Sequence, residues 1–285
     1  MSKEINNLKR TAVQIRKDIM DISAHCGGGA THVGPALSAA DIVAALYFKI
    51  MNVDPTNPSW EDRDRFILSK GHAYSVLYAA LAERGYFPRE ELMTTRNINS
   101  RLQGHPVLGK TPGVDMVSGS LGNGLSCGLG IAMGLKLQGK RKSRVYVMLG
   151  DGESQEGMVW EAAMCAPNKG IDNLVAIVDY NHLQSCGALD EINSLHPMVE
   201  KWESFGWKVF EMNGHDMDDI VSKLLIAREY AGQPVCLIAH TVKGRGVSFI
   251  EHNNAWHAKI ATEAEYQAAI EELDAQLTAI DADED

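Results

Sequence analysis

The chain has 285 residues, 45% of them hydrophobic and 22% charged, which is typical of a globular protein with a large core. Its 37 acidic and 27 basic residues give a formal net charge of −10. Because the basic residues form no run, the sequence argues against nucleic acid or a membrane as a partner.

The cysteines and the first segment of the chain both favour the cytoplasm. Five scattered cysteines without a Cys-x-x-Cys pair argue against a disulfide framework or a zinc site and fit a reducing compartment. The segment from Met1 to Asp21 is charged throughout and lacks the apolar core of a signal peptide. No apolar stretch reaches the length of a membrane span. We therefore expect a soluble cytoplasmic protein.

Two helices are predicted before the first strand. Apolar residues recur at helical spacing among charges over 7–23, which indicates an amphipathic helix. Ser38 is a candidate N-cap for a second helix, and Asp41 three residues later completes a start that resembles a capping box. Residues 42–50 would form the body of this helix.

Further along the chain, short apolar runs alternate with helical segments. Strands are expected at 65–69, 145–149, 174–178, 207–212 and 235–239. One helix is expected to follow Lys70-Gly71-His72 and to end at Leu81. Further helices are expected at 124–137, between the strands at 145–149 and 174–178, and at 216–230. This alternation implies right-handed βαβ crossovers and an α/β fold with a mostly parallel sheet, helices on both faces and an N-terminal helical layer. We expect residues 1–285 to form a single domain.

Polar residues follow two of these strands and predict a metal-held diphosphate. Asp151 lies between Gly150 and Gly152 after the strand at 145–149, and Asn181 follows the strand at 174–178. Adjacent parallel strands would present both side chains at their carboxyl ends, where open α/β sheets bind ligands. A carboxylate, an amide and a backbone carbonyl make an incomplete all-oxygen site, and Mg²⁺ usually completes such a site with water and phosphates.

A second glycine-rich turn opens the helix expected at 124–137. Residues 119–124 read Gly-Ser-Leu-Gly-Asn-Gly. The turn could be a tight loop that serves close packing. It could equally form one side of a ligand site, where it leaves room for a flat ring or presents N–H groups to an anion at the start of a helix. The residues alone leave both interpretations open.

Four of the ten histidines flank turn-forming residues instead of lying on an apolar face: His32, His72, His105 and His257. An imidazole titrates near neutrality and can donate hydrogen bonds to phosphate or polarise a carbonyl, although any one of these could be structural. The histidines show no His-x-x-x-His spacing, so the sequence does not indicate a zinc site on a helix. The other six are interpreted as structural: His25, His182, His196, His215, His240 and His252.

Taken together, these motifs resemble the thiamine-diphosphate-binding half of transketolase. The segment from Gly-Asp-Gly to Asn181 is similar to the thiamine diphosphate signature of that family. Around it, in order, lie the motifs at 62–72, 104–106, 119–122 and 241–247. The resemblance extends from about Leu8 to His257, and its independent motifs agree in order and spacing.

The resemblance implies a role for individual residues. Asp151, Asn181 and the carbonyl of Leu183 would hold Mg²⁺, or else Ca²⁺ or Mn²⁺. Contacts to thiamine diphosphate would come from His72, Gly119, Ser120, Leu121, Gly150, Gly152, Glu156 and Asn181. The histidines at the reacting carbons and sugar hydroxyls would be His32, His105 and His257, and His72 joins them as a catalytic candidate. Acidic residues near the subunit contact would be Glu156 and Glu161.

This sequence departs from the family pattern in two places. Thr31 and Pro35 replace glycines that are common around His32, and residues 256–260 differ from the usual Trp-His-Gly-Lys. These departures bear on the shape of the loop at His32 and on the role of His257.

A partner chain is also implied. A transketolase continues into a pyrimidine-binding domain and a third domain, so this chain is expected to be the diphosphate-binding subunit of a split enzyme. It would act only with a C-terminal, pyrimidine-binding subunit, in a heterotetramer with two copies of each. The reaction would transfer a two-carbon ketol unit from a ketose to an aldose, either of them free or phosphorylated.

Other interpretations come from the same residues. The chain could be an alpha-type subunit of a 2-oxo acid dehydrogenase, a module that binds thiamine diphosphate without catalysis, or a metal-dependent phosphatase. The Ser-Lys-Gly-His, Gly-His-Pro and Trp-His elements favour a polyol substrate and so weigh against the dehydrogenase. A metal held by one carboxylate and one amide, with no diphosphate, would bind poorly, which weighs against the phosphatase.

Overall fold

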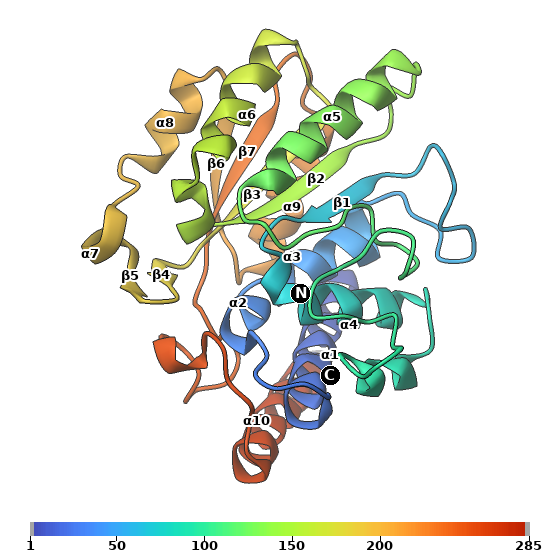
Figure 1. Ribbon diagram of the computed structural model, residues 1–285, viewed down its shortest axis with the longest axis vertical. Coiled ribbons are helices and arrows are strands. Elements are labelled where there is room, and N and C mark those ends of the chain that lie inside the picture. Colours follow the sequence, from blue (N-terminus) through green and yellow to red (C-terminus); the bar gives the residue numbers. More distant parts are fainter. Residues whose placement is uncertain (1–2, 283–285) are drawn as a thin grey trace.

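The computed structural model describes residues 3–282 and contains a central sheet of five parallel strands (Figure 1). The strand order is β1-β2-β3-β7-β6, and each neighbouring pair is parallel. The strands are β1 (Arg65–Leu68), β2 (Val145–Gly150), β3 (Leu174–Tyr180), β6 (Lys208–Asn213) and β7 (Val235–His240). This confirms the predicted α/β fold with a mostly parallel sheet.

Helices cover both faces of the sheet because successive side chains of each strand point to opposite sides. On β2, Val145, Val147 and Leu149 belong to one hydrophobic core, and Tyr146 and Met148 to the other. Figure 1 shows three helices together on the first face: α5 (Asn123–Leu137), α6 (Gly157–Asn168) and α8 (Met198–Ser204). The second core includes α1 (Lys3–His25), α3 (Ala40–Ala45), α4 (Tyr74–Arg84), α9 (Met217–Glu229) and α10 (Glu263–Ala282).

Short elements complete the fold, and several of them were not predicted. They are α2 (Val33–Leu37), the π-helical turn η1 (Leu46–Ile50), the 3₁₀ turns η2 (Gly71–Ala73), η3 (Arg89–Thr94), η4 (Gly152–Gln155) and η5 (Asn254–Trp256), the antiparallel hairpin β4 (Leu183–Gln184) and β5 (Gly187–Ala188), and α7 (Leu189–Asn193). The hairpin, α7, α8 and α10 had no counterpart in the sequence prediction. Among residues 3–282, no helix combines the length and the apolar character that a membrane span requires.

The predicted helix start at Ser38 is wrong. Ser38 lies between α2 and α3, and α3 has no side-chain cap. The hydroxyl of Ser38 donates instead to the Asp179 carboxylate at 2.6 Å, and the Asp41 carboxylate is paired with Arg16 and His215. Both side chains are buried and bond to polar groups far away in the sequence, so neither is available to cap the helix.

The order of the strands positions the functional site. The chain passes from β1 to β2 to β3 in one direction across the sheet, crosses to the edge strand β6, and returns to β7 beside β3. The sheet therefore reverses its winding between β3 and β7. In open α/β sheets, ligands bind at such a switch point, outside the carboxyl ends of the strands.

Helix α5 lies very close to the sheet, and two of its glycines permit this approach. A Cβ atom at Gly128 would lie 2.4 Å from Val147 Cγ2, and one at Gly124 would lie 2.2 Å from Ser69 Oγ. Gly130 lies on the same helix but faces open space, where an added Cβ atom would have no neighbour within 4 Å. Close approach of the helix thus depends on particular glycines.

We expect Gly128→Ala and Gly130→Ala to change stability in opposite directions. The first would force a methyl group into the stiff side chain of Val147 and lower the free energy of unfolding by about 1–3 kcal/mol. The second would remove backbone freedom from the unfolded chain at no steric cost and raise stability by about 0.5–1 kcal/mol. Urea denaturation of both variants checks this. Equal shifts in the two variants would contradict the close packing at Gly128.

Candidate active site

A cavity of about 450 Å³ opens at the carboxyl ends of the strands. The loops after β1, β2, β3 and β7 contribute to it, together with the segments at 32–35, 105–121 and 257. The predicted site residues that line it are His32, His72, His105, Gly119, Leu121, Gly150, Asp151, Gly152, Glu156, Asn181, Leu183 and His257. Two other predicted residues do not line the cavity. Ser120, between Gly119 and Leu121 in the sequence, is exposed, and Glu161 lies on the exposed surface of α6. Residues that are distant in the sequence are thus brought to one place.

The three predicted metal ligands meet in the cavity after β2 and β3. Asp151 accepts hydrogen bonds from the backbone N–H groups of Gly152, at 2.7 Å, and His182, at 2.6 Å. The side-chain oxygen of Asn181 accepts from the N–H of Leu183 at 3.1 Å, which fixes the turn that carries the Leu183 carbonyl. A carboxylate, an amide and a carbonyl form the oxygen set that suits a hard divalent cation.

The electrostatics around Asp151 favour a cation. Burial raises the pKa of this carboxyl to about 6, and the nearby negative charge of Asp179 acts in the same direction, against two backbone hydrogen bonds. A buried carboxylate with a raised pKa is stabilised when a positive charge comes close. The charge distribution of the site therefore fits a bound divalent cation.

Lys243 supplies a positively charged group to the cavity, and the sequence did not predict it as a site residue. Its ammonium group approaches the carbonyl oxygens of Leu183, at 3.3 Å, and Gln184, at 3.4 Å, and bonds to Asn254 Oδ1 at 2.9 Å. Burial lowers the pKa of Lys243 to about 8. The sequence could have indicated Lys243 as a site residue, because the Thr-Val-Lys-Gly-Arg-Gly segment directly follows a predicted strand.

Asp179, at the end of β3, organises the floor of the cavity. Its carboxylate is fully buried and accepts hydrogen bonds from Ser38, Lys70, Thr241 and, at 3.3 Å, the Asn181 amide. Burial favours the neutral carboxyl, but the ammonium of Lys70 and the hydrogen bonds together outweigh this and hold the pKa of Asp179 below its usual range. The network thus links the loops after β1 and β7 to the start of the predicted metal-binding turn.

Glu153 ties three of the glycine-rich loops together. Its carboxylate accepts from the hydroxyl of Ser69 at 2.5 Å and from the N–H groups of Gly122 and Gly150, both at 2.9 Å. Gly122 has φ +83°, a conformation that glycine adopts without strain. Glu153 thus fixes the loop entering α5 against the ends of β1 and β2.

Three of the candidate histidines form a compact cluster. The ring centroids of His32 and His72 lie 4.9 Å apart, those of His32 and His257 5.3 Å, and those of His72 and His257 5.4 Å. His105 lines the same cavity from the loop before α5, beside Gly119.

Burial keeps these imidazoles neutral. It lowers the pKa of His72 to about 2 and that of His257 to about 4, and it lowers the pKa of His32 and His105 from the usual value. A neutral imidazole can donate a hydrogen bond from one ring nitrogen and accept at the other. Nδ1 of His257 is buried without a hydrogen-bond partner.

The two segments that depart from the family pattern pair with each other. The backbone groups of Thr31 and Lys259 exchange two hydrogen bonds, of 3.2 and 3.0 Å, so the loop at His32 and the loop at His257 lie side by side. The carbonyl of Pro35 accepts a hydrogen bond from the Lys70 ammonium at 2.7 Å. The replaced residues thus take part in contacts that hold the site together.

Comparison with known proteins finds one family along nearly the whole chain. The family model described as transketolase, thiamine diphosphate binding domain, matches residues 8–277. The chain is 43% identical over 274 residues to 6-deoxy-6-sulfo-D-fructose transketolase subunit SqwG of Clostridium sp. (strain MSTE9), covering 96% of this chain and 98% of that protein. It is 39% identical over 274 residues to one subunit of the apulose-4-phosphate transketolase of Phocaeicola vulgatus, covering 96% of each.

Longer relatives match over part of their length. The transketolase of Rattus norvegicus is 40% identical over 277 residues, which cover 96% of this chain and 43% of that protein. A solved transketolase from Campylobacter jejuni superposes with a TM-score of 0.85 at 26% identity, covering 98% of this chain and 46% of that one. The chain therefore spans less than half of these transketolases but nearly all of the two subunit-length relatives.

We expect Asp179→Ala to destabilise the protein far more than Ser38→Ala. Without Asp179, the buried ammonium of Lys70 loses its anionic partner, and breaking a buried ion pair in this way costs about 3–5 kcal/mol. Without the Ser38 hydroxyl, Asp179 keeps its other donors, and the loss should be about 1 kcal/mol. Chemical denaturation of both variants measures the difference. Similar losses in the two would mean that the ion pair does not organise the site.

Proposed function

The chain belongs to the family of transketolase thiamine diphosphate-binding domains, and we propose that it is the diphosphate-binding subunit of a two-subunit transketolase. The reaction would transfer a two-carbon ketol unit from a ketose to an aldose, free or phosphorylated. The observation that carries this proposal is a cavity lined by Asp151, Asn181 and Leu183 together with the four candidate histidines. The two subunit-length relatives, covered over 96–98% of their length, support the division into subunits.

In this proposal, Asp151, Asn181 and the Leu183 carbonyl hold a divalent cation, Mg²⁺ or alternatively Ca²⁺ or Mn²⁺. The donor set and the raised pKa of Asp151 support a hard cation. The cation would hold the diphosphate group, and the buried Lys243 would add a second positive charge. The cofactor would further touch the residues that line its pocket or flank it: His72, Gly119, Ser120, Leu121, Gly150, Gly152, Glu156 and Asn181.

Thiamine diphosphate, when bound, supplies the electron sink for chemistry at a ketose carbonyl. The protein's own contribution is to orient the sugar and to hold protons at defined nitrogen atoms. The neutral rings of His32, His72, His105 and His257 can each donate to one oxygen and accept a proton from another.

The proposal extends to assembly and location. A C-terminal, pyrimidine-binding subunit would complete the site in a heterotetramer with two copies of each chain, and exposed Glu156 and Glu161 would lie near the subunit contact. One sheet contains strands from β1 at residue 65 to β7 at residue 240, which supports a single domain. All five cysteines are free thiols, which supports a cytoplasmic location.

We expect the purified chain to show ketol transfer only when the pyrimidine-binding subunit is added. The chain with thiamine diphosphate and Mg²⁺, with and without the chain encoded beside it, would be assayed on ketose and aldose phosphates. Turnover should require both chains, because the proposal assigns the pyrimidine-binding half of the cofactor site to the partner. Full turnover by this chain alone would overturn the division of the enzyme into two chains.

The raised pKa of Asp151 gives a pH dependence for cofactor binding. A protonated carboxyl cannot hold the cation, so affinity for Mg²⁺ and thiamine diphosphate should fall as the pH drops through about 6, by up to about tenfold per pH unit. Asp151→Ala should bind the pair roughly tenfold or more weakly at neutral pH and lose this pH dependence. Titration calorimetry of both proteins above and below this pH measures the effect. An unchanged pH profile in the variant would remove Asp151 from the metal site.

A further inference from the structure

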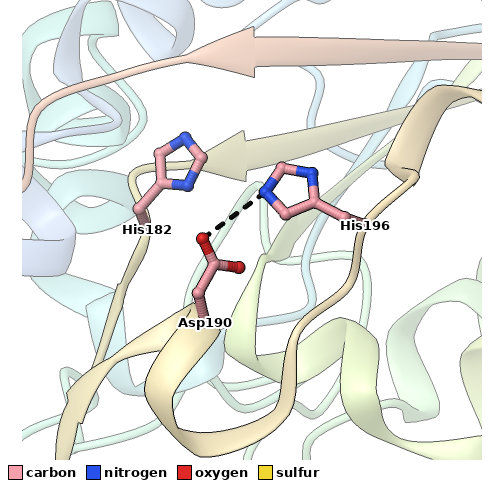
Figure 2. Close-up of side chains that lie close together, drawn as sticks. All are labelled: His182, Asp190 and His196. Carbon is pink, nitrogen blue, oxygen red and sulfur yellow. Dashed lines mark ion pairs between the residues drawn. The ribbon is translucent and has the colours of Figure 1, made fainter.

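Three side chains that can bind a metal lie together on the surface, outside the cavity. Figure 2 shows His182, Asp190 and His196 facing one another. One ligand atom from each residue lies within 4.8 Å of the other two, and His196 Nε2 is 3.4 Å from Asp190 Oδ2. All three side chains are exposed, so a cation could reach them from solvent.

We propose that His182, Asp190 and His196 form a binding site for a transition-metal cation of the Zn²⁺ class. Two imidazoles and one carboxylate suit zinc, whereas Mg²⁺ prefers oxygen ligands throughout. Ligands about 2.1 Å from a tetrahedral zinc lie about 3.4 Å from each other. The separation of the His196 and Asp190 atoms already matches this spacing, and a small movement of His182 would complete three corners of the tetrahedron. Water would occupy the fourth.

The backbone around His182 is held in place by two hydrogen bonds. Its N–H donates to Asp151 Oδ2 at 2.6 Å, and its carbonyl accepts from the N–H of Leu189 at 2.8 Å. The residue has φ +63°, a conformation that is uncommon outside glycine. These contacts fix the point from which the imidazole extends toward Asp190.

Ser194 orients the other two ligands. Its hydroxyl donates to Asp190 Oδ1 at 2.8 Å and accepts from the N–H of His196 at 3.3 Å. With Oδ1 engaged, Oδ2 is the oxygen that faces the His196 ring. Lys201 bonds to the carbonyl of His196 at 3.1 Å. Hydrogen bonds that orient the ligands in this way are a common feature of metal sites in proteins.

The charge of the trio also suits a cation, because Asp190 contributes a carboxylate beside the two imidazoles. His240 lies nearby but is already paired with Glu211 at 2.7 Å, so it does not belong to the trio.

Tyr180 lies beside the trio and packs against both histidine rings. Its ring centroid lies 4.1 Å from that of His182 and 6.3 Å from that of His196. The side chain is buried and its hydroxyl has no hydrogen-bond partner, which is costly for a buried polar group.

Zinc titration of the full-length protein tests the proposal. The protein would be saturated with Mg²⁺ and thiamine diphosphate, and Zn²⁺ would then be titrated in competition with a chromogenic chelator. We expect one zinc per chain that excess Mg²⁺ does not displace. Co²⁺ in place of zinc should show the visible absorption of tetrahedral coordination by nitrogen and oxygen.

Two variants that remove a ligand and one control variant complete the test. His196→Ala and Asp190→Asn should each weaken zinc binding by roughly tenfold or more, whereas His25→Ala, an exposed histidine at the end of α1, should leave it unchanged. Circular dichroism checks that each exposed substitution leaves the fold intact. Absence of zinc binding, or equal affinity in the His196, Asp190 and His25 variants, would overturn the site. Neither result depends on transketolase activity.

Discussion

The buried carboxylate of Asp179 is the group on which the rest of the site depends. A carboxylate without solvent is stable only when donors surround it, and these donors come from the residue after α2, from the loop after β1 and from the loop after β7. Each of those segments carries or adjoins a residue of the cavity. Satisfying one buried charge therefore brings together parts of the chain that are distant in sequence, and the apolar sheet beneath them supplies the rigidity.

The same burial sets the chemistry of the cavity. It raises the pKa of Asp151 to about 6 and lowers those of Lys243, to about 8, and His72, to about 2. Low dielectric disfavours every isolated charge, anion or cation alike. A divalent cation would offset the anion at Asp151, and a diphosphate would offset the cation at Lys243. The cavity is thus better suited to a metal diphosphate than to either ion alone.

The sequence predicted the structure best where an element depends on the pattern of neighbouring residues. Parallel strands buried on both faces appear as apolar runs, so the strands were predicted with the polar residues that follow them, such as Asp151 and Asn181. Partners that are distant in sequence cannot be read in this way. The roles of Ser38, Lys70 and Glu153 follow from neighbours up to 141 positions away, and the predicted helix start failed at Ser38 for that reason.

The surface histidines illustrate the same limit. A zinc site was disfavoured because no helix carries two histidines one turn apart, yet the turn after β3, α7 and the segment before α8 bring His182, Asp190 and His196 together. His182 also lies between Asn181 and Leu183, and its N–H bonds to Asp151. One short turn thus contacts the cavity through its backbone and the surface trio through a side chain. A cation at the trio would restrain the backbone that presents the Leu183 carbonyl, so the two proposed sites would be coupled through this turn without sharing a ligand.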